Sequence, residues 1–285
     1  MKSTGIIISG STGYIGSNLV RTLKSDRLLF TKRVTNQNST FKFVNSNHEE
    51  IKNLNEYFDN YIFVHLATHY SRDKIDDNKI KLANIDFGVN VLNQLSETKL
   101  LKIIYTNTMF TFYNNKNIRN LYYTKTKNEF AEKIKSFIVD KKIHFDEIYL
   151  DNTFGGNDNR KKIVQLISES IINKSVSPIK NESVSINIIY FQDVVKKLNN
   201  SINNLNSNKS IFVNPMSVKI KSIENFLKNY YLNAEIDINL LDYTNNDYLT
   251  NHPENFNSNI QLSSIDEKLI EYFDFIKLNK EPHSN

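Results

Sequence analysis

The sequence predicts an α/β fold built on a doubly wound parallel sheet, with a smaller C-terminal lobe. Three observations predict it. The chain opens on a strand, a glycine-rich turn and a helix, and apolar runs then alternate with helix-length segments as far as residue 150. Its 285 residues, 39% of them hydrophobic, suffice for one large domain or two joined domains. Alternating strands and helices form a parallel sheet covered on both faces.

The opening segment reads as strand, helix and strand. Residues 5–9 contain the uninterrupted apolar run Ile6, Ile7 and Ile8, which is typical of a strand buried on both faces. A helix is expected over residues 14–24, and Leu28-Leu29-Phe30-Thr31 forms the second strand. This order indicates a βαβ unit of the Rossmann type.

Further strands are expected wherever short apolar runs recur. They cover residues 61–66, 101–105 and 145–150, with helices over 79–98 and 123–138 between them.

Beyond residue 150 the alternation loosens, although residues 184–189 still read as a strand and two helical segments follow in an Asn-rich stretch. We expect a Rossmann domain of residues 1–150 plus about 184–214. A substrate-binding lobe of 151–183 and 215–285 would cover the carboxyl edge of the sheet, where open α/β sheets bind ligands.

Composition excludes several classes of protein. The net charge is +5, but Lys and Arg are dispersed among acids, so no nucleic-acid partner is expected. The chain has no cysteine, which removes disulfides, a thiolate nucleophile and a thiolate metal site, and we expect no metal. The first apolar run is too short for a signal peptide and no run of eighteen apolar residues occurs, so we expect a cytoplasmic protein without a membrane partner.

Glycine is scarce in this chain and concentrated in two places. There are seven glycines, where average usage of about 7% would give roughly twenty. Gly10, Gly13 and Gly16 directly follow the first strand, and Gly155 and Gly156 follow a later one. In such a turn the first glycine allows a tight bend, the second lets the backbone approach a pyrophosphate, and the third lets helix and strand pack closely. The turn therefore predicts a nucleotide site at a helix N-terminus, with a purely structural turn as the alternative.

The end of the second strand indicates which nucleotide is bound. An acid there would hold a ribose 2′-hydroxyl, whereas a base would accept a 2′-phosphate. The chain has Lys32 and Arg33 and no acid, so NADP(H) is favoured over NAD(H). A solvated charge, or stacking of Arg33 on adenine, is the alternative.

Tyr123 and Lys127 are four residues apart and share one face of the predicted helix. Near a nicotinamide, the lysine ammonium would lower the pKa of the phenol, which could then exchange a proton with a substrate oxygen. The 15 tyrosines and 30 lysines of the chain give one or two such pairs by chance, and Tyr70 with Lys74 is the other. Only the first pair opens a helix just after the strand that ends in a hydroxyl segment, so we assign the chemistry to it.

Five segments resemble the extended short-chain dehydrogenase/reductase family of the NAD-dependent epimerase/dehydratase type. They are GSTGYIG (10–16), VHLAT (64–68), KLANIDFGVNVL with Asn84, YTNT (105–108) and YTKTK (123–127), and YLDNTFGGND (149–158) and IIYFQDVV (188–195) match more weakly. The resemblance covers roughly the first 215 residues. Within the family it is closest to the sugar-nucleotide 4-ketoreductases similar to CDP-abequose synthase.

The resemblance implies roles for individual residues. Tyr123 would protonate the C4 oxygen of the substrate, Lys127 would hold the nicotinamide ribose, and Thr106 would hydrogen-bond the same oxygen, with Thr108 in reserve. Asn152 would contact the sugar diphosphate, with a turn role as the alternative. Other cofactor contacts are expected from the glycine turn and from the end of the 61–66 strand: Gly10, Thr12, Gly13, Tyr14, Ile15, Gly16, Leu66, Ala67 and Thr68. Thr68 is also expected to touch substrate, and His65 to be structural.

Positions at which the chain departs from the family's pattern reduce the range of activities that the resemblance implies. Sugar-nucleotide 4,6-dehydratases carry Thr-Asp-Glu where this chain has Thr106-Asn107-Thr108, and elimination of water needs that acid and base, so dehydration is not expected. The family's Arg-Asp is replaced by Ile186-Asn187, and another family arginine by Tyr149.

The expected function is NADPH-dependent reduction of the C4 keto group of a nucleotide-linked 4-keto-6-deoxy or 3,6-dideoxy hexose. The resemblance implies a homodimer that acts in surface-polysaccharide (O-antigen, lipopolysaccharide) precursor synthesis. One alternative is a 4-epimerase that retains NAD, and another is a non-catalytic NAD(P)-binding protein of the same fold.

Overall fold

The computed structural model of the chain describes residues 4–33, 41–70, 77–95, 99–119, 121–158, 160–232, 240–245 and 261–280. The chain divides into two compact units. One comprises Met1–Leu150 with Val195–Ile211, and the other comprises Asp151–Val194 with Phe212–Asn285. This division groups residues 184–194 and 212–214 with the second unit, and the expected domain boundaries stay predictions. The expected roles of the two units in binding cofactor and substrate stay predictions.

A sheet of eight strands forms the centre of the described first unit, in the order β11-β7-β6-β5-β1-β2-β3-β4. The strands are β1 Gly5–Ser9, β2 Leu28–Arg33, β3 Phe41–Asn45, β4 Glu50–Ile51, β5 Tyr61–His65, β6 Leu100–Thr108, β7 His144–Leu150 and β11 Asn208–Phe212. The pairs from β2 through β1, β5 and β6 to β7 are parallel. The chain continues in opposite directions on the two sides of β1, which confirms the predicted doubly wound α/β fold.

One edge of this sheet departs from the prediction. Strand β3 pairs antiparallel with β2, and β4 pairs antiparallel with β3, so the sheet is mixed and not wholly parallel. No strand was expected there.

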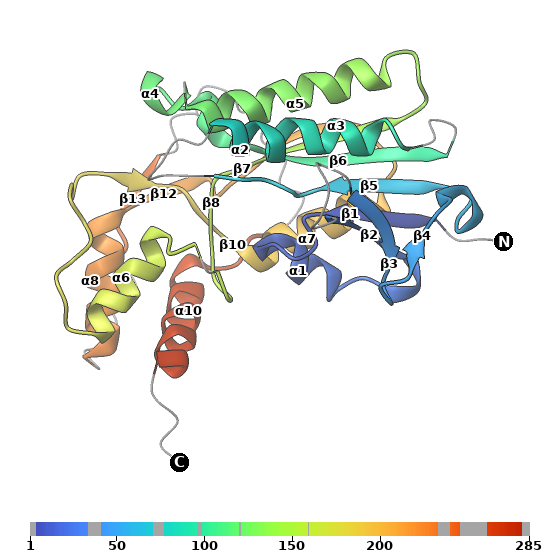
Figure 1. Cartoon of the computed structure of the whole chain (residues 1–285). Coiled ribbons are helices and arrows are strands. Elements are labelled where there is room, and N and C mark those ends of the chain that lie inside the picture. The colour runs from blue at the N-terminus through green and yellow to red at the C-terminus, as the bar shows by residue number, and fades with distance from the viewer. Residues whose placement is uncertain are drawn as a thin grey trace. The chain divides into compact units, whose positions relative to one another are not determined.

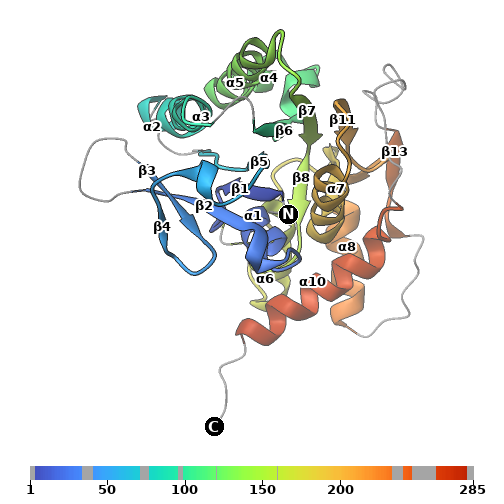
Figure 2. The same cartoon turned by 90° about the vertical axis from the view of Figure 1, so that its right-hand side faces the viewer.

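Helices cover both faces of the sheet. Those of the first unit are α1 Tyr14–Val20, α2 Asp77–Lys81, α3 Phe87–Leu92, α4 Lys116–Arg119, α5 Tyr122–Ile138 and most of α7 Phe191–Asn203, with short 3-10 turns at Ser25–Arg27, Leu54–Glu56 and Met109–Phe112. A π-helix, Leu82–Asp86, joins α2 to α3. Figures 1 and 2 show α2, α3 and α5 over one face of the sheet, and α1 and α7 over the other.

The buried strands hold the helices in place through a continuous apolar core. Ile7, Phe63 and Ile103 from neighbouring strands are completely buried and belong to one cluster with Phe130 and Ile134 of α5. The side chains of α5 that follow Tyr123 at helical spacing are therefore fixed against the sheet. This packing fixes the position of the helix that carries the expected catalytic pair.

The second unit has a separate set of elements. Its helices are α6 Ile163–Ile172, α8 Ile220–Tyr231 and α10 Ile265–Lys280, and its strands are β8 Asn152–Phe154, β9 Ser185–Ile186, β10 Ile188–Tyr190, β12 Met216–Lys219 and β13 Tyr243–Asn245. Strands β8 and β10 pair parallel, and β13, β12 and β9 form an antiparallel sheet. The expected strand over 184–189 is thus split at Asn187, whose side-chain amide donates to the carbonyl oxygens of Asn214 (2.7 Å) and Met216 (3.1 Å).

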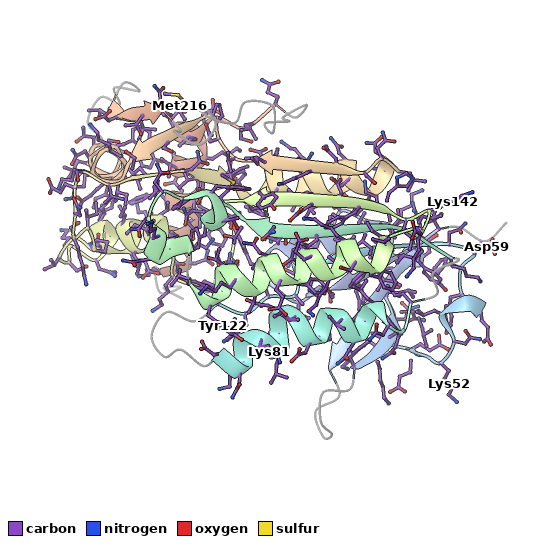
Figure 3. All side chains as sticks on the ribbon, turned by 90° about the horizontal axis from the view of Figure 1, so that it is seen from above. Lys52, Asp59, Lys81, Tyr122, Lys142 and Met216 are labelled. Carbon is purple, nitrogen blue, oxygen red and sulfur yellow. The ribbon has the colours of Figure 1, made fainter. Side chains whose placement is uncertain are left out.

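The parallel strands give the first unit two different edges. Asp59 and Lys142 lie two residues before β5 and β7 and on one side of Figure 3, whereas Tyr122, at the start of α5, lies on the other side. Tyr122 therefore marks the carboxyl edge, where open α/β sheets bind ligands. None of the helices in the described part of the chain has the length and apolar composition that a membrane span requires.

Candidate active site

The glycine turn after β1 is packed too tightly for side chains at two of its positions. Gly10 has φ +76°, and a Cβ there would lie 2.6 Å from the backbone nitrogen of Ala67. At Gly16 a Cβ would lie 2.1 Å from the Gly10 carbonyl oxygen, whereas the nearest atom at Gly13 is 3.2 Å away. The glycine turn therefore packs directly on the backbone that follows β5, and the first turn of helix α1 packs directly on the glycine turn.

Ser9 and His65 connect the strands directly beneath this turn. The Ser9 hydroxyl lies 2.7 Å from Nδ1 of His65, and the Leu66 amide donates to the Ser9 carbonyl oxygen at 3.0 Å. His65 is completely buried, and burial together with the charge of Lys127 lowers its pKa to about 3. A neutral buried imidazole suits the structural role expected for His65, and its Nε2 has no hydrogen-bond partner within the described residues.

Lys127 is a buried lysine whose ammonium faces an aromatic ring. Only 3% of the residue is exposed, and Nζ lies 4.3 Å from the centroid of the Tyr105 ring. Burial lowers the pKa of Lys127 to about 7, and the charge of Glu147 acts in the opposite direction. A lysine whose pKa lies near 7 can gain or lose its charge when a ligand binds.

Tyr123 lies one helical turn before Lys127, in the first turn of α5. Its ring meets Tyr70 edge-on at 5.0 Å between centroids, and Phe110 at 6.3 Å. Tyr70 is therefore a neighbour of Tyr123, while Lys74, its partner in the alternative pair, lies outside the described residues.

Asn84 links the loop after β5 to the start of α5. Its Oδ1 accepts from the hydroxyl of Thr68 (3.2 Å) and the backbone amide of His69 (2.7 Å). Its Nδ2 donates to the His69 carbonyl oxygen and to the hydroxyl of Thr126, which in turn donates to the carbonyl oxygen of Tyr123 at 2.9 Å. Asn84 lies in the π-helix, a feature frequent at functional sites.

The two candidate hydroxyls lie at different depths in β6. Thr106 pairs with Ile148 inside the sheet, whereas Thr108 is the last residue of β6 and pairs with Leu150. Both lie on the strand face opposite that of Tyr105, because side chains alternate along a strand. The Thr108 hydroxyl accepts from the Phe110 amide at 3.3 Å, and the Phe110 ring contacts Tyr123, so Thr108 is the hydroxyl closer to the carboxyl edge.

A buried polar cluster beside these residues was not identified from the sequence. It consists of Glu147, Asn107, Asn128 and Tyr149, which hydrogen-bond to one another. The available signal was the acidic pair Asp146-Glu147 within an apolar strand, because buried carboxylates require partners.

The remaining cofactor candidates lie in the first unit at the expected elements. Thr12 is exposed in the glycine turn, Tyr14 and Ile15 begin α1, and Lys32 is exposed near the end of β2. Arg33 ends β2, and its side chain lies outside the described residues. Helix α1 ends at Val20, four residues earlier than predicted.

Asn152 belongs to the second unit, and its expected contact with the sugar diphosphate stays a prediction. Its side-chain amide donates to the Asp151 carboxylate (2.7 Å) and to the Asn187 carbonyl oxygen (3.2 Å). These contacts join β8 to the segment before β10, which fits the turn role that was the alternative. Within the described residues no group of His, Asp and Glu is arranged to hold a metal ion.

A tight glycine turn next to β5, together with a buried lysine one helical turn after a tyrosine, defines a Rossmann-type protein with the short-chain dehydrogenase/reductase arrangement. The profile of the NAD dependent epimerase/dehydratase family matches residues 6–213, and the chain belongs to this family. A comparison with curated protein sequences finds no significant match.

Solved structures share the fold over nearly the whole chain at low sequence identity. UDP-glucuronic acid 4-epimerase from Bacillus cereus in complex with NAD has a TM-score of 0.71 and 14% identity over 99% of both chains. UDP-N-acetylglucosamine 4-epimerase from Methanobrevibacter ruminantium has 0.69 and 17%, over 98% of this chain and 100% of that one. WbmF from Bordetella bronchiseptica, in complex with NADH, has 0.70 and 13%, over 98% and 93%.

Proposed function

We propose that the protein reduces the C4 keto group of a nucleotide-linked 4-keto-6-deoxy or 3,6-dideoxy hexose, with NADPH as the reductant. The observation that carries the proposal is Lys127, a buried ammonium one helical turn after Tyr123 with no carboxylate in hydrogen-bond contact among the described residues. A buried cation without a close counter-charge is costly, and such groups concentrate at functional sites.

The residues present fit a nicotinamide dinucleotide. The backbone at Gly10 and Gly16 excludes side chains, as a pyrophosphate-binding turn requires, and Lys127 can donate to the ribose hydroxyls. When bound, this cofactor supplies the hydride that the carbonyl carbon receives. Lys32 and Arg33 favour a 2′-phosphate, while the NAD and NADH in the related solved structures make NAD(H) the alternative.

Tyr123 acts as the acid in this proposal. Its hydroxyl gives a proton to the C4 oxygen, and the protonated Lys127 stabilises the phenolate that remains. Asn84 holds the first turn of α5 through Thr126, which fixes the position of Tyr123 relative to the π-helix.

A threonine hydroxyl completes the group by donating to the same substrate oxygen. The resemblance assigns this role to Thr106, with Thr108 in reserve. Thr108 is the last residue of β6 and lies next to Phe110, which contacts Tyr123. This position supports assigning the role to Thr108 before Thr106.

The second candidate function is a 4-epimerase of the same family. The names of the similar structures favour it, because several are 4-epimerases of UDP-sugars, and this also supports a nucleotide-sugar substrate. An epimerase returns the hydride to the other face of C4 and so keeps its cofactor oxidised and bound between turnovers.

One experiment separates the two. The purified protein is denatured and the released nucleotide identified. Fresh protein is then given NADPH or NADH with CDP-, dTDP-, GDP- and UDP-linked 4-keto-6-deoxy sugars and, in a separate assay without added reductant, the corresponding 4-hydroxy sugars. A ketoreductase consumes stoichiometric reductant with one of these substrates and releases little NAD(H). Tightly bound NAD(H) with interconversion of C4 epimers, and no net consumption of reductant, would replace our proposal with the epimerase.

A further inference from the structure

We infer that Glu147 is a positioning residue of the proposed active site, which through Asn107 fixes the end of β6 relative to the helix that carries Lys127. The inference deepens the proposed function and rests on it. Glu147 is a buried carboxylate on β7 to which no role was assigned from the sequence or from the comparisons.

The carboxylate of Glu147 is held by three groups. Its Oε1 accepts from Asn107 Nδ2 at 2.8 Å and from the Tyr149 hydroxyl at 2.7 Å, and Oε2 lies 3.6 Å from Nζ of Lys135. Only 2% of Glu147 is exposed. A carboxylate at this depth requires hydrogen-bond partners, and these three groups hold it in a fixed orientation.

Asn107 joins this carboxylate to both candidate catalytic elements. Its Nδ2 also donates to Asn128 Oδ1 at 3.2 Å, and its Oδ1 accepts from the backbone amide of Thr108 at 2.8 Å. Asn128 directly follows Lys127 in α5, and its Oδ1 also accepts from the Thr111 hydroxyl at 3.0 Å. The hydrogen bonds therefore run from β7 through the last residues of β6 to the helix turn of Lys127.

An ionised Glu147 dictates which way the Asn107 amide is turned. A carboxylate only accepts hydrogen bonds, so the NH₂ group of Asn107 must point toward it, and the amide oxygen is then left for the Thr108 N–H. A side chain of the same shape without the negative charge would fix this orientation less strongly. Loss of the orientation would release the N–H of Thr108, the hydroxyl residue nearest the carboxyl edge.

The charge of Glu147 also acts on Lys127. The groups that face this lysine are His65 on β5, Tyr105 on β6, Glu147 on β7 and Tyr123 on its own helix. His65 is neutral near pH 7, and burial raises the pKa of the Tyr105 phenol, so that phenol is neutral as well. Glu147 is thus the carboxylate that favours the charged lysine against burial.

The test compares Glu147→Gln, Glu147→Leu and a matched control, Asp146→Asn. Asp146 is also a buried carboxylate of β7, but it pairs with Nζ of Lys102 at 3.2 Å on the opposite face of the strand. All three variants lose one buried charge and some stability, so the control separates general destabilisation from a specific effect. Steady-state kcat and KM are measured across pH for each folded variant, with NADPH and the accepted 4-keto sugar.

We expect Glu147→Leu to lose about tenfold to a hundredfold in kcat with little change in KM, because the reacting groups are misplaced. Glu147→Gln keeps an acceptor oxygen and is expected to recover part of that loss. In the pH profile of kcat for Glu147→Gln, the alkaline limb, where Lys127 loses its proton, should move to lower pH by about one unit. Asp146→Asn should keep both the wild-type kcat and the wild-type limb.

A second measurement does not depend on turnover. The ¹³Cε resonance of Lys127, assigned with the Lys127→Arg variant, is titrated by NMR in the cofactor-free protein. Titration at lower pH in Glu147→Gln than in wild type and Asp146→Asn supports the inference, even if no 4-keto sugar is turned over. Equal Lys127 titration in all three proteins, or a kcat and pH limb of Glu147→Gln that match those of the control, would overturn it and leave the proposed function intact.

Discussion

The ammonium of Lys127 lies 4.3 Å from the centroid of the Tyr105 ring, and the Tyr105 hydroxyl donates a 3.0 Å hydrogen bond to the backbone carbonyl oxygen of Lys127. The tyrosine thus anchors the helix turn and presents its ring face to the charge that this turn carries. A cation–π contact of this kind is worth about 2 kcal/mol when desolvated, less than the hydration that the buried ammonium gives up. Burial of the Lys127 ammonium therefore lowers the stability of the folded protein and places a charge where a ligand can bind it.

This cost gives a prediction for the stability of Lys127→Met in the cofactor-free protein. The pKa of Lys127 is about 7 when folded, against an ordinary value of 10.5. Between these values the unfolded chain binds the extra proton, so the free energy of unfolding of the wild type rises with pH, and below pH 7 the full penalty applies. Each unit of the shift corresponds to about 1.4 kcal/mol. Chemical denaturation should find Lys127→Met more stable than wild type at pH 6, with the difference shrinking toward pH 10; a difference that is independent of pH contradicts the assignment.

The glycine turn gives a second prediction, with a control inside the same motif. A Cβ at Gly16 would lie 2.1 Å from a carbonyl oxygen, whereas at Gly13 the nearest atom is 3.2 Å away. Gly16→Ala should lose about 1–3 kcal/mol of stability through overpacking, together with cofactor binding. Gly13→Ala should fold with a Tm near that of wild type. Equal melting temperatures for the two variants would show that α1 packs on the turn less closely than described.

The two threonines of β6 are distinguished by a third pair of variants. Thr108 ends the strand and lies next to the segment that contacts Tyr123, while Thr106 is paired within the sheet. We expect Thr108→Val to lower kcat about tenfold to a hundredfold through loss of a hydrogen bond to the substrate oxygen, and Thr106→Val to have the smaller effect. Steady-state kinetics on both folded variants checks this, and the reverse order would return the role to Thr106.

Cofactor choice is tested at the end of β2. Lys32 is exposed there, and Lys42, opposite it on β3, is paired with Glu50 at 2.6 Å. Replacing Lys32 and Arg33 together by Ala should weaken NADPH binding about tenfold or more, since charge-assisted hydrogen bonds to a 2′-phosphate are lost. Binding of NADH should hardly change. Titrations by cofactor fluorescence measure both, and a wild-type protein that prefers NADH refutes the expectation directly.

The sequence predicted the central fold because its signals are local. The run Ile6 to Ile8 and the scarce glycines after it specify a buried strand and a tight turn without reference to distant residues. The antiparallel β3 and β4 were missed because they are short, with five and two residues. The apolar positions of β3, Phe41 and Phe43, are also interrupted by the exposed Lys42.

The candidate site was predictable only in part, for a related reason. The spacing of Tyr123 and Lys127 was visible, but the burial that lowers the pKa of Lys127 arises from β5, β6 and β7 together. The predicted strand ended at residue 105, yet Asn107 is buried within β6, where Glu147 and Asn128 satisfy its amide. Such partners are 21 and 40 residues away in the chain and become evident only in the folded structure.

The central claim, that Tyr123 is the acid of a nicotinamide-dependent reaction at the carbonyl of a nucleotide sugar, is tested most directly by Tyr123→Phe. The oxidation of NADPH, or of NADH if that is the cofactor, is followed with the accepted 4-keto sugar, and the cofactor Kd is measured on the same preparations. The account predicts a wild-type Kd and a kcat lower by about a hundredfold to ten-thousandfold. A Tyr123→Phe protein that reduces the sugar at the wild-type rate would contradict it.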